Sequence, residues 1–223
     1  MYADLLLFIS LIITIGAQIF VSISYSKYKK VSNGKGISGF EVASKILKDN
    51  GLDDIYVIET SGNLTDHYDP SNRVIRLSHD VFHGESISAM AVAAHEASHA
   101  IQYKEGNMFI KIRSVIFPLV SFASNFGYFA ILLGIILGSF KLFYFGIFLF
   151  VVILLFQLLT LPVEFGASHN ALKKLKKDFS LTDDAFISAK TVLTAAALTY
   201  VASLATSILQ IVRLLGLRDR NDR

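Results

Sequence analysis

The feature that most constrains this chain is a set of long apolar stretches without charged residues. Three of them, 5–24, 115–139 and 142–163, contain no Asp, Glu, Lys or Arg. A helix needs about 20 mainly apolar residues to cross the roughly 30 Å hydrocarbon core of a bilayer, so each stretch predicts a membrane-spanning helix. A fourth stretch, 191–212, is rich in Ala, Thr and Ser; both a fourth span and a buried or interfacial helix remain open for it.

The composition agrees with a membrane protein and narrows the chemistry. Only 17% of the residues are charged, against about 25% in soluble globular chains, and 53% are hydrophobic. These figures exclude an intrinsically disordered chain, a collagen and a coiled coil. The chain has no Cys, which excludes a disulfide framework, a thiol nucleophile and a Cys-ligated metal. Any bound metal must therefore be held by His, Asp and Glu.

Flanking charges predict how the chain is oriented. Asp4 precedes the first stretch without a basic region, which favours a retained anchor over a cleaved signal peptide. Lys and Arg follow the first span, precede the second and follow the third, whereas the turn between the second and third holds only Lys141. Because basic residues stay in the cytoplasm, we expect a multi-pass cell-membrane protein with its N-terminus outside. The net charge of +3 is too small to suggest nucleic acid as a partner.

The C-terminus disagrees with this orientation. If the fourth stretch spans the bilayer, the basic tail that follows it lies outside, with Arg213, Arg218, Arg220 and Arg223. Either the charge rule is broken there or the fourth stretch does not cross fully.

The segment between the first two spans predicts a compact α/β unit. Ser38 and Glu41 form a capping box before a helix that ends at Gly51. Short β-branched runs at 55–59 and 73–78 predict strands, and Ser86 caps a helix running to about Tyr103. We expect a mainly α membrane protein with three to four transmembrane helices and a small α+β cytoplasmic part. The expected organisation is an anchor at 1–24, a cytoplasmic α/β segment at 25–114, a transmembrane hairpin at 115–163, a cytoplasmic helix at 164–190, and an apolar helix with a basic tail at 191–223.

The last helix of the α/β segment contains the sequence His95-Glu96-Ala97-Ser98-His99. Two His four residues apart lie on one helix face, so both imidazoles can reach one ion, and Glu96 can take a proton from a water at the open position. The alternative is a pair of core histidines with ordinary hydrogen bonds. That alternative is disfavoured because unpartnered ionisable groups are costly in an otherwise apolar helix.

A catalytic zinc of this kind needs a third protein ligand, and Glu164 is the strongest candidate. It is the only acid between Glu105 and Asp178, and it directly follows an apolar span and Pro162. Ionisable residues at such depth usually have a functional partner. The alternative is a Glu at the level of the lipid headgroups, or one paired with Lys173.

The motif around His95 to Gln102, together with Leu161-Pro-Val-Glu164-Phe-Gly-Ala-Ser168, resembles the bacterial YugP-like membrane zinc metallopeptidases. These are similar to the membrane gluzincins of the HtpX and CAAX prenyl protease type. The resemblance implies a zincin-like cytoplasmic part that carries the HExxH helix, and one zinc per chain, bound by His95, His99 and Glu164, with Glu96 as general base. Ser98 departs from the usual Gly. Gly166, His169 and Asn170 depart from an expected acidic residue followed by basic ones.

A few further residues are predicted to support the metal ligands or to contact the substrate. Ser168, one turn beyond Glu164, is expected to hold a ligand imidazole through its second nitrogen. His79 and His83 are candidates for an oxyanion donor or a substrate contact, with a surface-loop histidine as the alternative. The run 73–78 is expected to be an exposed edge strand, which could pair with an extended substrate or simply protect the edge.

These observations predict an integral membrane zinc endopeptidase that acts on a protein or peptide substrate at the cytoplasmic face of the bilayer. An inactive metalloprotein serving as a scaffold or chaperone partner is the alternative, although a degenerate site would be free to lose Glu96. A transporter or channel is disfavoured because the first three spans carry no charge. Oligomeric state and cleavage specificity are not predicted.

Overall fold

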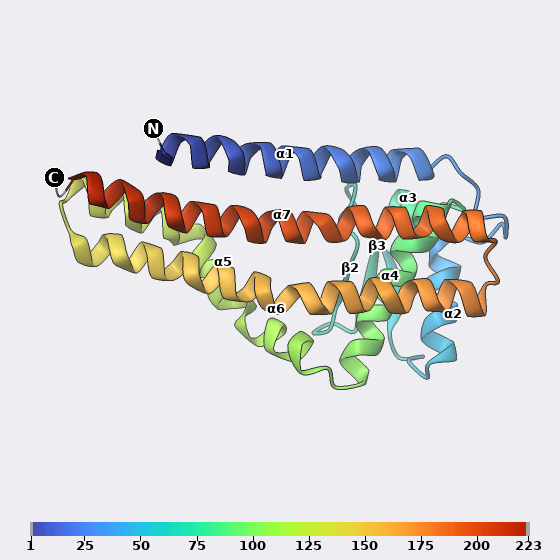
Figure 1. Ribbon diagram of the computed structural model, residues 1–223. Helices are drawn as coiled ribbons and strands as arrows, with labels where there is room; N and C mark the ends of the chain where they lie inside the picture. Colours follow the sequence, from blue (N-terminus) through green and yellow to red (C-terminus); the bar gives the residue numbers. More distant parts are fainter. Residues whose placement is uncertain (1, 222–223) are drawn as a thin grey trace. The chain divides into compact units, whose positions relative to one another are not determined.

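A computed structural model describes residues 2–221 of the chain, and Figure 1 shows its ribbon. Arg223 of the basic tail lies outside the described residues. The described part is mainly helical with a small sheet, which confirms the predicted fold class. Its elements are α1 (Tyr2–Tyr28), α2 (Gly39–Asp49), β1 (Tyr56–Thr60), β2 (His67–Asp69), β3 (Val74–Ser78), α3 (His79–Phe82), α4 (Ile87–Lys104), α5 (Met108–Ile136), α6 (Phe140–Asp178) and α7 (Asp183–Asn221).

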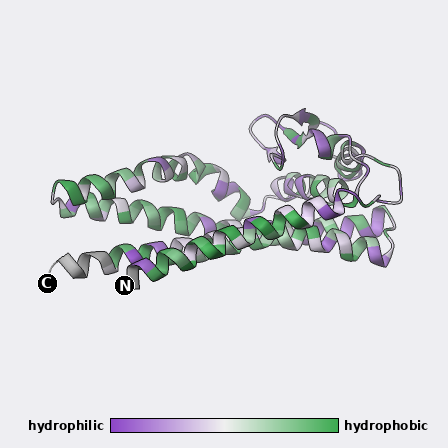
Figure 2. Ribbon diagram, turned by 90° about the horizontal axis from the view of Figure 1, so that it is seen from above, coloured by the Kyte–Doolittle hydropathy of each residue, from purple (hydrophilic) through white to green (hydrophobic). Residues whose placement is uncertain are grey.

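Four of the described helices are long and apolar enough to cross a membrane. The qualifying stretches are Asp4–Tyr28, Met108–Ile136, Phe140–Asp178 and Asp183–Gly216. Figure 2 shows hydrophobic residues along the long helices, with hydrophilic ones more frequent in the loops. By length and composition, α7 is therefore long and apolar enough to cross a membrane, as are the helices of the three uncharged stretches.

The chain divides into two compact units, and each is described by itself. The first comprises residues 1–18, 109–162 and 198–223. Within it, α5 and α6 form the predicted hairpin through the short link 137–139. A Cβ on Gly134 would lie 2.6 Å from the backbone nitrogen of Phe143, and one on Gly146 would lie 2.4 Å from Ile131. The two helices thus approach through glycines, as helices packed in membranes commonly do.

The second unit comprises residues 19–108 and 163–197. Its α2 begins with the predicted capping box: the Ser38 hydroxyl accepts from the Glu41 N–H, and the Glu41 carboxylate accepts from the Ser38 N–H at 2.7 Å. Ser86 caps α4, as predicted, by accepting from the Ala89 N–H at 3.2 Å. These side chains satisfy N–H groups that a helix start leaves without partners.

The sheet corrects one expectation from the sequence. Its strand order is β1-β3-β2, with β3 parallel to β1 and antiparallel to β2. The run 73–78 is therefore the central strand of the described sheet, and its prediction as an exposed edge was wrong. The cause is β2, three residues within a turn-rich stretch, too short to show the alternation by which strands are recognised. Both the Val74 and Ile75 side chains of β3 are buried, as a central strand requires.

Helix α4 lies at the centre of this second unit. Fourteen of its 18 residues are buried, and most of them are small. A helix buried on nearly all sides needs neighbours all round, which α2, the sheet, and parts of α6 and α7 supply. From Pro162 onward α6 continues without a break. It buries one residue per turn on one face, namely Val163, Ala167, Ala171 and Leu175. That stripe turns the neighbouring positions 164 and 168 inward as well.

Candidate metal centre

The two histidines of α4 stand one turn apart with their rings converging. The Nε2 atoms of His95 and His99 are 3.1 Å apart, and the ring planes are nearly perpendicular at 86°. His99 is buried and His95 is 12% exposed at its side chain. Two imidazole nitrogens this close, both facing the same point, are arranged as ligands of one ion are arranged.

Glu164 of α6 completes the group. Its Oε2 lies 3.2 Å from His95 Nε2 and 3.6 Å from His99 Nε2. Its residue surface is 2% exposed, so Glu164 does not reach toward lipid headgroups or water. The structure therefore brings together the three predicted ligand residues, two from α4 and one from α6. In the sequence, Glu164 follows His99 by 65 positions. A buried carboxylate is tolerated there because the His95 imidazole lies within hydrogen-bonding distance of it and the His99 imidazole lies close by, at 3.6 Å.

The triangle formed by the three atoms fits a tetrahedral zinc ion. Zinc binds His nitrogen and carboxylate oxygen at about 2.0–2.2 Å, which puts neighbouring ligand atoms about 3.3 Å apart. The three separations here are 3.1, 3.2 and 3.6 Å. Three protein ligands leave one tetrahedral position open, which is the pattern of catalytic zinc sites. The donor set, with no Cys, also matches the borderline character of zinc.

The other ring nitrogens are held by neighbouring side chains. Ser168 Oγ lies 3.2 Å from His95 Nδ1, as its position one turn beyond Glu164 predicts. His99 Nδ1 lies 3.1 Å from Gln102 Oε1, and the Gln102 amide donates to the Val163 carbonyl at 2.9 Å. Since the amide nitrogen is the donor to Val163, its oxygen accepts from His99. Such contacts fix each ring so that its Nε2 lone pair faces the centre.

Gln102 was not assigned a role from the sequence, although a signal was available. It stands three residues after His99, which places it on the same helix face. Gly166 has a related explanation. A Cβ at that position would lie 2.8 Å from Gln102 Nε2, so the small residue leaves room for the amide between α4 and α6. Gly166, where the family resemblance leads us to expect an acidic residue, thus stands at a position where the Gln102 amide leaves no room for a larger side chain.

Glu96 is buried near the three candidate ligand residues. Its carboxylate accepts a hydrogen bond from the Tyr68 N–H of β2 at 3.0 Å. Burial raises the pKa of Glu96 to about 7, and the nearby His95 opposes that rise. A carboxyl with this pKa changes protonation near neutral pH. The contribution of β2 escaped sequence reasoning because a strand of three residues leaves no periodic pattern.

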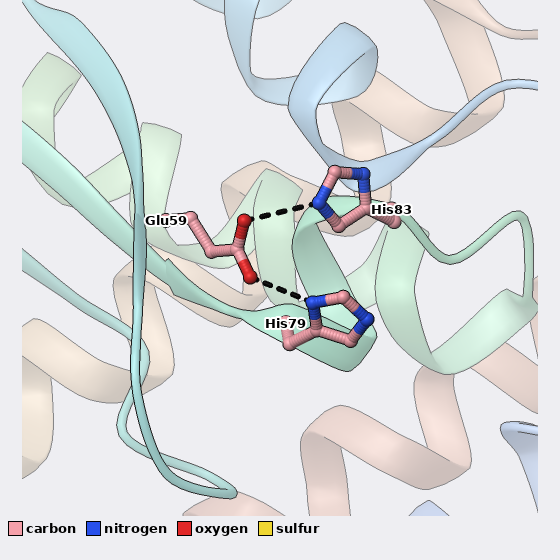
Figure 3. A group of neighbouring side chains, drawn as sticks. All are labelled: Glu59, His79 and His83. Atoms are coloured by element: carbon pink, nitrogen blue, oxygen red, sulfur yellow. Dashed lines mark hydrogen bonds and ion pairs between the residues drawn. The ribbon is translucent and has the colours of Figure 1, made fainter.

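His79 and His83 form a different group. Their rings contact the carboxylate of Glu59 on β1, His79 through Nδ1 at 2.6 Å and His83 through Nε2 at 3.0 Å (Figure 3). All three side chains are exposed, by 42–72%. The contacts that the two histidines make are thus with Glu59, and a role as oxyanion donor or substrate contact stays a prediction. Their exposure agrees with the surface histidines that the sequence left open as the alternative.

Comparison with known proteins gives the same family by two routes. Residues 3–219 match the profile of the family described as "Putative neutral zinc metallopeptidase". The chain is also 43% identical over 209 residues to the "Putative membrane protease YugP" of Bacillus subtilis, covering 92% of this chain and 93% of that protein. No solved structure gives a match. With a family match over nearly the whole length and this identity, the chain belongs to the YugP-like family of membrane zinc metallopeptidases.

Proposed function

We propose that the chain is an integral membrane zinc endopeptidase whose single catalytic centre is formed by His95, His99, Glu164 and Glu96. The observation that carries the proposal is the triangle of three ligand atoms, with separations near those of a tetrahedral zinc site, next to a buried carboxyl group. Family membership supports the same chemistry at the level of zinc peptidases.

His95, His99 and Glu164 would hold the zinc ion. When bound, zinc supplies Lewis acidity that polarises a scissile carbonyl and makes a water molecule acidic near neutral pH. The chain's own contribution is orientation. Ser168 and Gln102 hold the two rings by their Nδ1 atoms, and the helix fixes the His spacing. A site held this way keeps its geometry while substrates exchange.

Glu96 acts as the general base. Its carboxylate accepts a proton from water and passes it to the departing amine, so that the peptide bond is cleaved without net proton uptake by the enzyme. The Tyr68 N–H fixes one carboxylate oxygen, Oε2, at 3.0 Å. That bond leaves the second oxygen free to exchange the proton.

The substrate binds as an extended peptide near β2. Since β3 is central, β2 is the outer strand of the described sheet on the side that contacts Glu96. A strand edge recognises peptide backbone through main-chain hydrogen bonds, without demanding a particular side chain. In this proposal β2 takes the place of the run 73–78, for which the sequence offered substrate pairing as one of two alternatives.

The catalytic centre lies on the cytoplasmic side. The Lys and Arg residues that flank the first three apolar stretches support this orientation. Because the chain has no Cys, a single Cys introduced at Ser61 is a clean reporter. It should resist a membrane-impermeant maleimide in intact cells and react after lysis. Labelling in intact cells would contradict the proposed orientation and place Ser61 outside the cell.

The central experiment replaces Glu96 with Gln and measures zinc content and cleavage of fluorescein-labelled casein by the purified chain. We expect stoichiometric zinc and a cleavage rate lower by about 10²–10⁴-fold, since a general base contributes roughly that much. Asp80→Asn is the matched control. Asp80 also follows a histidine directly, but it is half-exposed and paired with Lys29.

Retained cleavage in Glu96→Gln would overturn the assignment of the base. A wild-type chain that binds zinc but cleaves nothing would favour the inactive scaffold instead. A wild-type chain without zinc would overturn the proposed function.

A further inference from the structure

The surface group of Glu59, His79 and His83 has the donor composition of a metal site. One ligand atom from each residue lies within 4.8 Å of the others. The two histidines are four residues apart, and their rings are 4.8 Å apart at 53°, so they do not stack. Figure 3 shows the Glu59 carboxylate reaching from β1 toward both rings. Three donors thus converge from two separate elements.

The local sequence repeats the pattern of the buried centre. His79-Asp80-Val81-Phe82-His83 places an acid directly after the first of two histidines, as His95-Glu96 does. In both groups a Glu from another element supplies the third donor. The difference lies in the acid that follows the first histidine. Asp80 is shorter than Glu and is engaged by Lys29, so it is not free to act as a base.

The surroundings leave room for a hydrated ion. A surface cavity of about 440 Å³ is lined by both histidines and also by Asp80 and Glu85. Lys29 and Lys30 line the same cavity and offset the charges of Asp80 and Glu85, so the negative charge that favours a cation comes from Glu59 itself. Water from the cavity can fill the coordination positions that three protein donors leave open.

We propose that Glu59, His79 and His83 form a second, solvent-exposed site for a divalent transition-metal ion of the zinc class. Two imidazoles and a carboxylate suit Zn²⁺, Ni²⁺ and Cu²⁺, and disfavour Mg²⁺ and Ca²⁺, which prefer all-oxygen ligands. The site is independent of the proposed peptidase centre, because it shares no residue with it.

The bound ion joins β1 to α3. Glu59 lies next to the end of β1, and the two histidines span α3 and its C-terminal cap. Since α3 is followed closely by α4, the ion restrains the segment that leads into the helix of the buried centre. It is a binding site without hydrolytic chemistry, because Asp80 is held by Lys29.

The test uses the full chain in detergent micelles, stripped of metal and titrated calorimetrically with ZnCl₂ alone. The background variant is His95→Ala/His99→Ala, which leaves only the surface group intact. We expect this variant to bind one zinc per chain, and the further change His79→Gln/His83→Gln to weaken binding by about tenfold or more. His67→Gln is the matched control: His67 is exposed, contacts the Thr65 carbonyl and belongs to neither group.

Absence of zinc binding by the background variant, or binding that His79→Gln/His83→Gln leaves unchanged, overturns the second site. If the background variant does not fold, zinc content is compared in the otherwise wild-type chain. It should fall from two ions to one on His79→Gln/His83→Gln, and an unchanged content overturns the proposal. A failure of the peptidase centre would appear instead as a loss of cleavage with the surface ion retained.

Discussion

The described part of the molecule contains two groups of the same composition in opposite environments. Each has two histidines four residues apart and a glutamate from another element. In the buried group the side chains of His95, His99 and Glu164 are 12%, 8% and 3% exposed. In the surface group all three are exposed by more than 40%. The ligand pattern is therefore common to both, and burial distinguishes them.

Burial changes what the same donors can do. In a dry site a charge interacts more strongly with its neighbours, and an unpaired one is costly, so the buried donors need one another or an ion. Ser168 and Gln102 also hold the buried rings. The surface donors can exchange their contacts for water at little cost. We therefore expect tight metal binding with chemistry at the first group and weaker, exchangeable binding at the second.

The largest effect should come from the glutamate of the buried group. Glu164→Gln removes the only charged ligand from a site that water reaches poorly, so zinc affinity should fall by more than about 100-fold and cleavage with it. Glu59→Gln at the surface group should weaken zinc binding by only about tenfold, since water can replace the lost oxygen. Calorimetric titration of variants that retain one group each measures both values. Equal losses of zinc affinity at the two groups would contradict the view that burial distinguishes them.

A smaller effect should follow from the side chains that hold the buried rings. Ser168→Ala and Gln102→Ala should each lower zinc affinity by about 10–100-fold, because the ring orientation and tautomer are no longer fixed. Ser98→Ala is the matched control: Ser98 is buried on the same helix, but its hydroxyl donates to the Ala94 carbonyl at 2.8 Å. Competition with a chromophoric zinc chelator measures the affinities. An equal loss in the control would indicate a general effect of changing a buried polar group.

The smallest effect should come from Gly166→Ala. The new methyl group displaces the flexible Gln102 amide, so we expect zinc affinity to fall several-fold, less than on removal of Gln102 itself. The free energy of unfolding should change little, because the cost of moving the Gln102 amide is offset by the helix propensity of Ala, about 1 kcal/mol better than that of Gly. Gly16→Ala, at a helical glycine with nothing within 4 Å, controls for that gain. Thermal unfolding and zinc titration separate the two quantities, and unchanged affinity in Gly166→Ala would remove the packing explanation.

Local patterns in the sequence predicted much of the fold. The four apolar helices, the two helix caps in the α/β segment and two of the three strands follow from hydropathy, capping residues and β-branched runs, which depend on near neighbours alone. The central position of β3 does not follow, since it depends on its pairing with a three-residue strand. Edge or centre is a property of the sheet and cannot be read from one strand.

The candidate site divides in the same way. The sequence by itself determined the donors: an HExxH helix, a lone acid after an apolar span, and no Cys. Only the tertiary structure decided that Glu164 lies 3.2 Å from His95, that Gln102 holds His99, and that Glu59 joins His79 and His83. The physical reason is that residue type sets which atoms can donate electrons to a metal. Their convergence and burial depend on packing between segments far apart in the chain.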